Sequence, residues 1–167
     1  FSPTWDSLGG GERYASAVAN LLTNSGYEVD IWWPANLSSQ IKKRFNIDIS
    51  RARFVPFPSN YQLSTTNYKL VFWVSDGSIP ISFARKTLIH YQIPFKNPGA
   101  LNKIKARFYT SVCNSFYTKE VTDKVYGVNS QVVYPPVDVD AFTPMTKTNS
   151  IVSIARFSTL LHAKRQD

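Results

Sequence analysis

The sequence predicts an α/β fold, with a Rossmann-like parallel sheet flanked by helices. Short apolar runs alternate along the chain with amphipathic segments, and this alternation is typical of strand–helix–strand units. The run KLVFWVS at 69–75 is nearly all apolar, as expected for a strand buried on both faces. With 167 residues, of which 43% are apolar and 18% charged, the chain can bury one sizeable core and does not resemble a disordered protein.

The first expected helix follows three consecutive glycines at 9–11 and ends at Gly26. Apolar residues recur in it at helical spacing, namely Tyr14, Val18, Leu21 and Leu22. Further strands are expected at 27–33, 69–75, 87–92, 110–115 and 130–136, and further helices near 37–45, 100–109 and 116–126. Ser115 is the expected N-cap of the last helix, and Gly127 its C-terminal end.

We expect three parts along the chain. Residues 1–136 form the Rossmann-like domain, 137–149 form a polar, proline-bearing linker, and 150–167 begin a second domain with the strand-like run IVSIARF. The opening FSPTW resembles the end of a strand, and the chain stops just after a new strand begins. We therefore expect the sequence to be a fragment of a longer protein.

Cysteine content and hydropathy point to a cytoplasmic protein. Cys113 is the single cysteine, which excludes an internal disulfide and fits a reducing compartment. No run reaches the roughly 18 apolar residues of a membrane span, and no signal segment opens the chain. The net charge of +8 suggests an anionic partner, which could be nucleic acid, a lipid surface or a phosphorylated ligand.

The glycines at 9–11 raise the question of a phosphate site, because backbone N–H groups at a helix N-terminus bind anions. The dinucleotide pattern G-x-G-x-x-G fails, since its third position falls on Tyr14, and the nucleoside-triphosphate loop is absent. Asp30 is expected at the end of the second strand, where a ribose-binding acid would lie. One such acid is not enough to indicate a dinucleotide site when the glycine pattern does not match. A tight turn with helix packing remains the structural alternative.

Four strand-end loops are expected to open on one edge of the sheet, where open α/β sheets bind ligands. They are built around Gly10, Asp76, His90 and Ser115. Each has a structural alternative: Asp76 fits an ordinary turn, His90 a core position, and Ser115 a helix cap. Their convergence is the argument for a cleft. No pair of His or Cys has metal-ligand spacing, so no metal site is expected.

Nearly the whole chain, in order, resembles the N-terminal half of a family-four glycosyltransferase, a retaining enzyme of the GT-B fold with two Rossmann-like domains. GGGERYASAVANLLTNSGYEVDI resembles the family's opening loop, helix and second strand, and LIHYQIPF its histidine-bearing strand. The most specific stretch is CNSFYTKEVTDKVYGVNSQVVYPPVDVDAFTP, which leads into the interdomain linker. IVSIARF then resembles the first strand of the donor-binding domain, and HAKRQD its basic loop.

The resemblance implies transfer of a sugar from a nucleotide-sugar donor to a saccharide or lipid-linked acceptor, with retention of configuration. His90 would be the catalytic residue, in contact with the transferred sugar. Gly10 and Gly11 would approach the donor diphosphate or the acceptor. Arg156 and Lys164 would neutralise the leaving diphosphate, so that neither a metal nor another cofactor is required.

Some features depart from the family's pattern. Arg156 and Lys164 are eight residues apart where many members have six, which leaves Arg165 as an alternative to Lys164. The paired-glutamate segment and the base-reading loops are absent, so residues 1–167 alone are expected to be inactive.

Two other functions stay open, a non-catalytic sugar-phosphate-binding domain and a basic nucleic-acid-binding α/β module. The second predicts lysines and arginines clustered on one face, whereas here they are scattered along the sequence, so no nucleic-acid partner is expected. The positive charge and the abundant aromatic residues suit peripheral association with the cytoplasmic face of a membrane.

Overall fold

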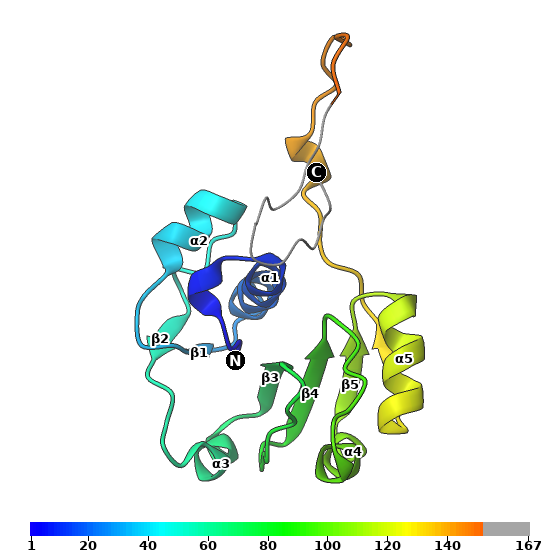
Figure 1. Ribbon diagram of the computed structural model, residues 1–167. Helices are drawn as coiled ribbons and strands as arrows, with labels where there is room; N and C mark the ends of the chain where they lie inside the picture. The colour runs from blue at the N-terminus through cyan, green and yellow to red at the C-terminus, as the bar shows by residue number, and fades with distance from the viewer. Residues whose placement is uncertain (152–167) are drawn as a thin grey trace. The chain divides into compact units, whose positions relative to one another are not determined.

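The computed structural model describes residues 1–151, and Phe1–Pro136 form one compact unit (Figure 1). The residues from Val137 onward belong to a second unit. Its described part is irregular apart from one 3₁₀ turn, η3 (Val139–Ala141). The predicted strand at 151–157 lies outside the described residues except for its first position.

The main sheet has four parallel strands in the order β3-β4-β5-β6. They are β3 (Leu70–Val74), β4 (Lys86–Tyr91), β5 (Thr110–Cys113) and β6 (Gln131–Val132). A second parallel pair consists of β1 (Asp30–Trp32) and β2 (Arg53–Val55). Together with the flanking helices, this arrangement confirms the predicted Rossmann-like α/β fold.

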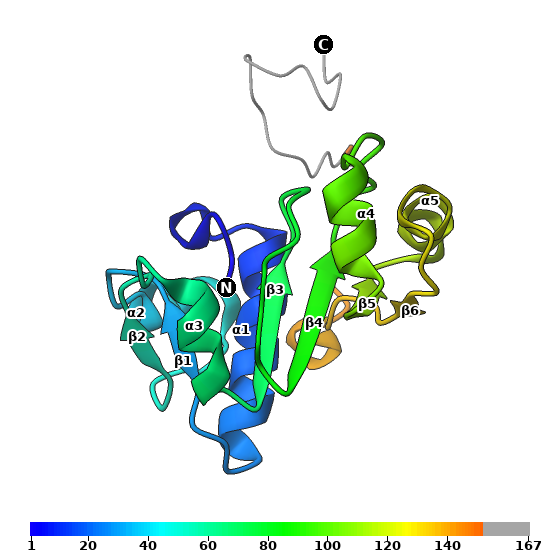
Figure 2. The same ribbon diagram turned by 90° about the horizontal axis from the view of Figure 1, so that it is seen from below.

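Four helices accompany the strands, together with shorter turns (Figures 1 and 2). They are α1 (Gly10–Asn24), α2 (Ser38–Phe45), α4 (Ala100–Ala106) and α5 (Phe116–Tyr126). The shorter pieces are η1 (Trp5–Ser7), α3 (Tyr61–Ser64) and η2 (Thr65–Asn67). Within residues 1–151, no helix is long and apolar enough to cross a membrane.

Both ends of α5 form as predicted. The Ser115 hydroxyl accepts the Thr118 backbone N–H at 3.2 Å, which satisfies one of the amides left free at a helix start. Gly127 adopts a left-handed conformation with φ of 69°, which ends the helix. The first helix differs in one respect from its expected apolar stripe, because Leu21 is 65% exposed.

The apolar residues form two clusters, one on each face of the strands. One joins α1 and α2 and includes Ala19, Ile31 and Val74. The other includes Trp32, Trp73 and Tyr126 and lies with α4 and α5. Because neighbouring residues of one strand divide between the two clusters, the strands are covered on both faces, as parallel strands generally are.

Candidate functional site

Parallel strands bring their carboxyl ends to one edge of the main sheet. Val74, at the end of β3, pairs with His90 of β4, and Tyr91 pairs with Cys113 at the end of β5. The loops that follow therefore share this edge, and the first turn of α1 reaches it as well. The structure thus places His90 and the loops after β3 and β5 at the edge where open α/β sheets bind ligands.

The N-terminus of α1 already holds a carboxylate. Glu12 is buried and accepts the Gly9 backbone N–H at 3.0 Å and the hydroxyls of Ser2 and Ser7 at 2.7 and 2.8 Å. Burial raises the pKa of Glu12, but these hydrogen bonds outweigh it and hold the pKa below its usual value. A negative charge in the first helical turn offsets the positive end of the helix dipole, so this turn by itself attracts phosphate weakly.

The two predicted glycines have different surroundings. Gly10 is exposed, and a Cβ built there would meet no atom within 4 Å. Gly11 is buried, and a Cβ there would lie 2.6 Å from Nε2 of Gln92. Gly11 therefore lets the α1 backbone come close to the residue that follows β4. The amides of this first turn have no carbonyl partner within the helix.

His90 is fully buried in this structure. Its ring stacks on Tyr14, with 3.9 Å between ring centroids, and lies 5.7 Å from the ring of Phe72. Neither ring nitrogen has a hydrogen-bond partner among the described residues. Burial lowers the pKa of His90 to about 4, so the imidazole is neutral at neutral pH. Because the ring is fully buried, a ligand could reach it only if covering side chains such as Tyr14 moved.

Asp76 and Ser115 mainly make local hydrogen bonds. The Asp76 carboxylate accepts the backbone N–H and the hydroxyl of Ser78, which closes the turn after β3. Ser115 caps α5. Within residues 1–151, Asp76 has no hydrogen bond to another predicted position. These contacts agree with the structural alternative for both residues, although Asp76 remains exposed to solvent.

Gln92 and Asn114 lie at the same edge, and Gln92 was not singled out from the sequence. The Asn114 side chain donates to the Gln92 backbone carbonyl at 2.8 Å, and its Oδ1 accepts the Thr118 hydroxyl at 2.9 Å. The Nε2 of Gln92 is buried, faces Gly11 and has no partner among the described residues. A signal was present, because Gln92 is the last residue of the predicted strand 87–92 and Asn114 is next to the last of the predicted strand 110–115.

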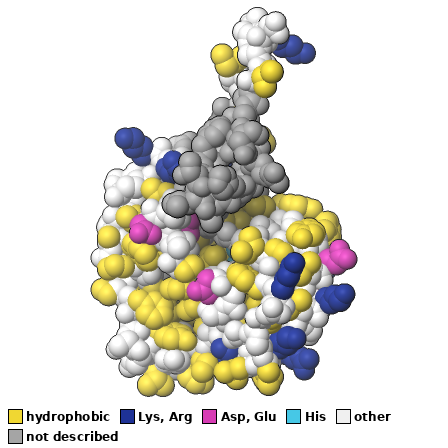
Figure 3. All heavy atoms as spheres, viewed as in Figure 1, with side chains coloured by type: hydrophobic (Ala, Val, Ile, Leu, Met, Phe, Trp, Pro, Cys, Tyr) yellow, Lys and Arg dark blue, Asp and Glu magenta, His cyan; other side chains and the backbone are white. Residues whose placement is uncertain are grey.

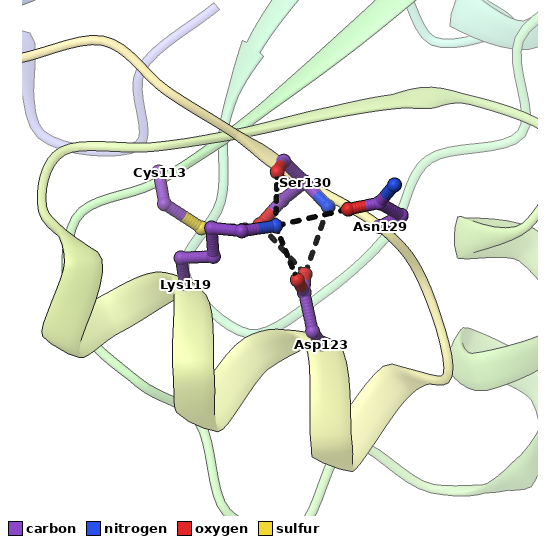
Figure 4. Close-up of polar contacts among 5 residues, drawn as sticks. All are labelled: Cys113, Lys119, Asp123, Asn129 and Ser130. Carbon is purple, nitrogen blue, oxygen red and sulfur yellow. Dashed lines mark hydrogen bonds and ion pairs between the residues drawn. The ribbon is translucent and has the colours of Figure 1, made fainter.

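A polar network behind this edge fixes the segment between α5 and β6 (Figure 4). Asp123 accepts the backbone N–H and the hydroxyl of Ser130 at 2.8 and 2.7 Å and pairs with Lys119. Lys119 also donates to Asn129 at 3.0 Å, and Cys113, the last residue of β5, donates to the Ser130 hydroxyl at 3.3 Å. The network anchors the strand end from which Asn114 projects.

The expectation for Asp30 was wrong. It stands at the start of β1 instead of the end. The ladder forms only where β2 provides a partner, so the expected strand 27–33 is shortened to three residues. Arg53 and the Tyr68 hydroxyl each donate to the Asp30 carboxylate at 2.8 Å, so both oxygens are engaged.

Arg156 and Lys164, the two predicted diphosphate-binding cations, lie outside the described residues. Across residues 1–151, no three His, Cys, Asp or Glu side chains are grouped so that they could hold a metal ion.

No family model, no curated protein and no solved structure matches this chain.

Proposed function

We propose that Phe1–Pro136 is the acceptor-side domain of a retaining glycosyltransferase that uses a nucleotide-sugar donor. The donor's nucleotide would be held mainly by a second domain, to which Arg156 and Lys164 would belong. The acceptor is a saccharide or a lipid-linked saccharide. No metal is required in this proposal, because fixed cations neutralise the leaving diphosphate. The resemblance to family-four enzymes supports this assignment.

The observation that carries the proposal is the meeting of Gly11 and Gln92 beside Asn114. Amide side chains offer both donors and acceptors, which suits the hydroxyls of a sugar. The buried Nε2 of Gln92 lacks a partner among the described residues, and a buried donor without an acceptor costs about 1–3 kcal/mol. A ligand hydroxyl at this edge would supply that acceptor.

His90 would take part as a neutral ring. With its pKa lowered to about 4 by burial, it can donate one hydrogen bond and accept another, but it does not carry positive charge at neutral pH. It lies near the end of β4, two residues before Gln92, which supports a role close to the proposed sugar site. The side chains that cover the ring, Tyr14 among them, would have to move for a ligand to reach it.

Charge and exposed apolar residues favour an acceptor at a membrane surface. Leu101, Ile104 and Phe108, in and just after α4, are 67%, 54% and 80% exposed, and Lys103 and Arg107 lie between them in the chain. Apolar side chains beside cations suit the interface of an anionic bilayer. On the face shown in Figure 3, apolar side chains cover much of the lower half, and Lys and Arg side chains lie both among them and at the edges.

Binding to vesicles tests the membrane part of the proposal. We expect the protein to sediment with vesicles containing anionic lipid and to stay in solution with neutral ones. Phe108→Ser should weaken sedimentation several-fold. Phe142→Ser, at another strongly exposed phenylalanine after the turn η3, serves as the control. Equal effects of the two variants would contradict a docking role for the α4 region.

Nuclear magnetic resonance titration tests the site itself. UDP-glucose, GDP-mannose and the free sugars are added to the chain, and backbone and side-chain amide shifts are followed. We expect the largest changes at Gly10, Gly11, Gln92 and Asn114. Gln92→Ala should reduce the response, and Gln62→Ala on α3 should not. Shifts confined to other parts of the sheet would contradict the proposed site.

A further inference from the structure

A basic pocket lies at the amino edge of the main sheet, at the opposite ends of the strands from the candidate site. Figure 1 shows the tails of the β4 and β5 arrows at the lower side, beside α4, whereas the loops of the candidate site follow the arrowheads. Since β4 has six residues, about 17 Å of strand separates the two edges. A small ligand at the amino edge therefore could not also touch Gly11 or Gln92.

Two segments of the chain line this pocket, which we term the amino-edge pocket. Residues 82–87 end the β3–β4 connection and begin β4, and residues 105–110 end α4 and begin β5. The pocket has a volume of about 630 Å³. Small-molecule sites have volumes of about 300–1,000 Å³, so there is room for more than a single ion.

Four of the lining side chains are cations, namely Arg85, Lys86, Lys105 and Arg107. Within residues 1–151, none of them pairs with a carboxylate. The sequence explains why, because residues 77–119 contain seven lysines and arginines and no aspartate or glutamate. The fold thus gathers, in one pocket, cations from separate parts of the chain.

The helix α4 accounts for only part of this gathering. Lys105 and Arg107 stand at its carboxyl end, where cations stabilise the helix dipole. Arg85 and Lys86 belong to the other segment, so the dipole does not explain them. A concavity lined by charges of one sign attracts counter-ions, and an anion bound there would relieve the repulsion among the cations.

Hydrogen bonds join the two segments and give the pocket a fixed shape. The Tyr109 hydroxyl accepts the Ser82 backbone N–H at 3.0 Å, and the buried Thr87 hydroxyl donates to the Ser82 hydroxyl at 2.7 Å. Lys105 donates to the Ile79 carbonyl, and partial burial lowers the pKa of its ammonium group. A bound phosphate would favour the charged form of Lys105 and offset this effect.

We propose that the amino-edge pocket binds a phosphomonoester or diphosphate group, independently of the sugar-transfer reaction. A phosphomonoester carries a charge of about −1.5 to −2 at pH 7, so one or two such groups suit the four cations. The planar guanidinium of arginine binds two phosphate oxygens at once, and lysine adds a point charge.

The group is carried by a soluble compound or by a lipid headgroup. Phe108 lines the pocket and is 80% exposed, so its ring offers a contact to the apolar part of either carrier. A nucleic-acid strand suits the pocket less, because surfaces that bind single strands are grooves that follow the backbone over several nucleotides.

Nuclear magnetic resonance titration locates the site. Pyrophosphate or glycerol phosphate is added at about 0.1 M salt, which screens distant charges, and glycerol is the uncharged control. We expect the largest backbone amide shifts at Lys86, Thr87 and Thr110. Shifts confined to Gly11 and Gln92 would overturn the amino-edge pocket without contradicting the proposed acceptor domain.

Four variants measure what the cations contribute. Arg85→Gln and Lys105→Met should each weaken pyrophosphate binding roughly tenfold, as the loss of a charge-assisted hydrogen bond implies. Arg51→Gln and Lys43→Met remove exposed cations elsewhere and should change it less than about twofold. Because Arg85 is exposed, its replacement leaves the fold intact. Equal weakening by all four variants would overturn the proposal, since only overall charge would then matter.

Vesicles distinguish the two carriers. Phosphatidic acid carries a phosphomonoester and phosphatidylglycerol a phosphodiester, and vesicles of the two are compared at equal surface charge. A preference for phosphatidic acid that Arg85→Gln removes would assign the pocket to a lipid headgroup. Binding of glycerol phosphate without that preference would assign it to a soluble compound. Failure of pyrophosphate, glycerol phosphate and phosphatidic acid alike to bind would overturn the proposal, as would tighter binding of a single-stranded oligonucleotide that depends on Arg85.

Discussion

The buried His90 gives the sharpest prediction of pH-dependent stability. Its imidazole has no exposed surface and no hydrogen-bond partner among the described residues, and Tyr14 covers one face. Protonation would place a positive charge in an apolar site, so the folded chain resists it while the unfolded chain does not. The perturbation is His90→Phe, which keeps an aromatic ring against Tyr14 and removes the titrating group.

The sign and size follow from the two pKa values. The pKa of His90 is about 4 in the folded state and 6.5 in the absence of burial. Between these values the unfolded chain binds more protons, so the free energy of unfolding falls as the pH drops from 6.5 towards 4. At pH 5 the loss is about 2 kcal/mol, from 1.36 kcal/mol per unit over about 1.5 units. For a chain of this size, that corresponds to a fall in melting temperature of roughly 4–8 °C.

Urea unfolding at pH 7 and pH 5 measures this. We expect His90→Phe to lose less stability between the two pH values than the unchanged chain, by about 2 kcal/mol. Burial lowers the pKa of the Phe1 amino group to about 5, so this group titrates over the same pH range. The test is therefore the difference in pH dependence between His90→Phe and the unchanged chain, because the amino group contributes equally to both. His162→Phe removes the other imidazole as a control. An unchanged pH dependence in His90→Phe would refute the buried, neutral histidine.

Three further predictions concern the supports of the fold. Asp123→Ala removes the carboxylate that accepts two hydrogen bonds from Ser130 and pairs with Lys119. It should lower the free energy of unfolding, measured by urea titration, by about 2–4 kcal/mol. Asp140→Ala, at an exposed position, should change it by less than about 0.5 kcal/mol. Burial raises the pKa of Asp123, but hydrogen bonds from Lys119 and Ser130 outweigh it and lower the pKa overall. The stabilising contribution of Asp123 is therefore present above the usual carboxyl range and is lost as the pH falls through the lowered pKa. Asp123→Ala should abolish this pH dependence. Gly127→Ala forces a side chain into a φ of 69° and should cost about 1–2 kcal/mol by thermal melting, while Gly10→Ala, where the position is open, should cost less than about 0.5 kcal/mol.

The elements that the sequence predicts well have signals at both ends. The helix α5 is bracketed by Ser115 and Gly127, and both act as expected because capping depends on neighbouring residues alone. The elements β2 and α3 were not predicted. Their region at 53–64 is interrupted by Pro56 and Pro58 and shows no clear period, and β2 exists only through its pairing with β1.

In the candidate site too, local sequence predicts some features, whereas others depend on tertiary contacts. The apolar run around His90 predicts a strand, with His90 near its carboxyl end. Its burial under Tyr14 could not, since that contact joins residues 76 positions apart in the chain through the packing of α1 on the sheet. The role of Gln92 depends on its approach to Gly11, which is likewise a tertiary contact.

The anomeric configuration of a transferred sugar tests the proposed function most directly. The intact protein is incubated with nucleotide sugars and saccharide or lipid-linked acceptors, and the new glycosidic bond is examined by nuclear magnetic resonance. We predict a product whose anomeric configuration equals that of the donor, formed without added metal, and formed more slowly by Gln92→Ala than by Gln62→Ala. An inverted product, or no transfer from any common donor, would contradict the account.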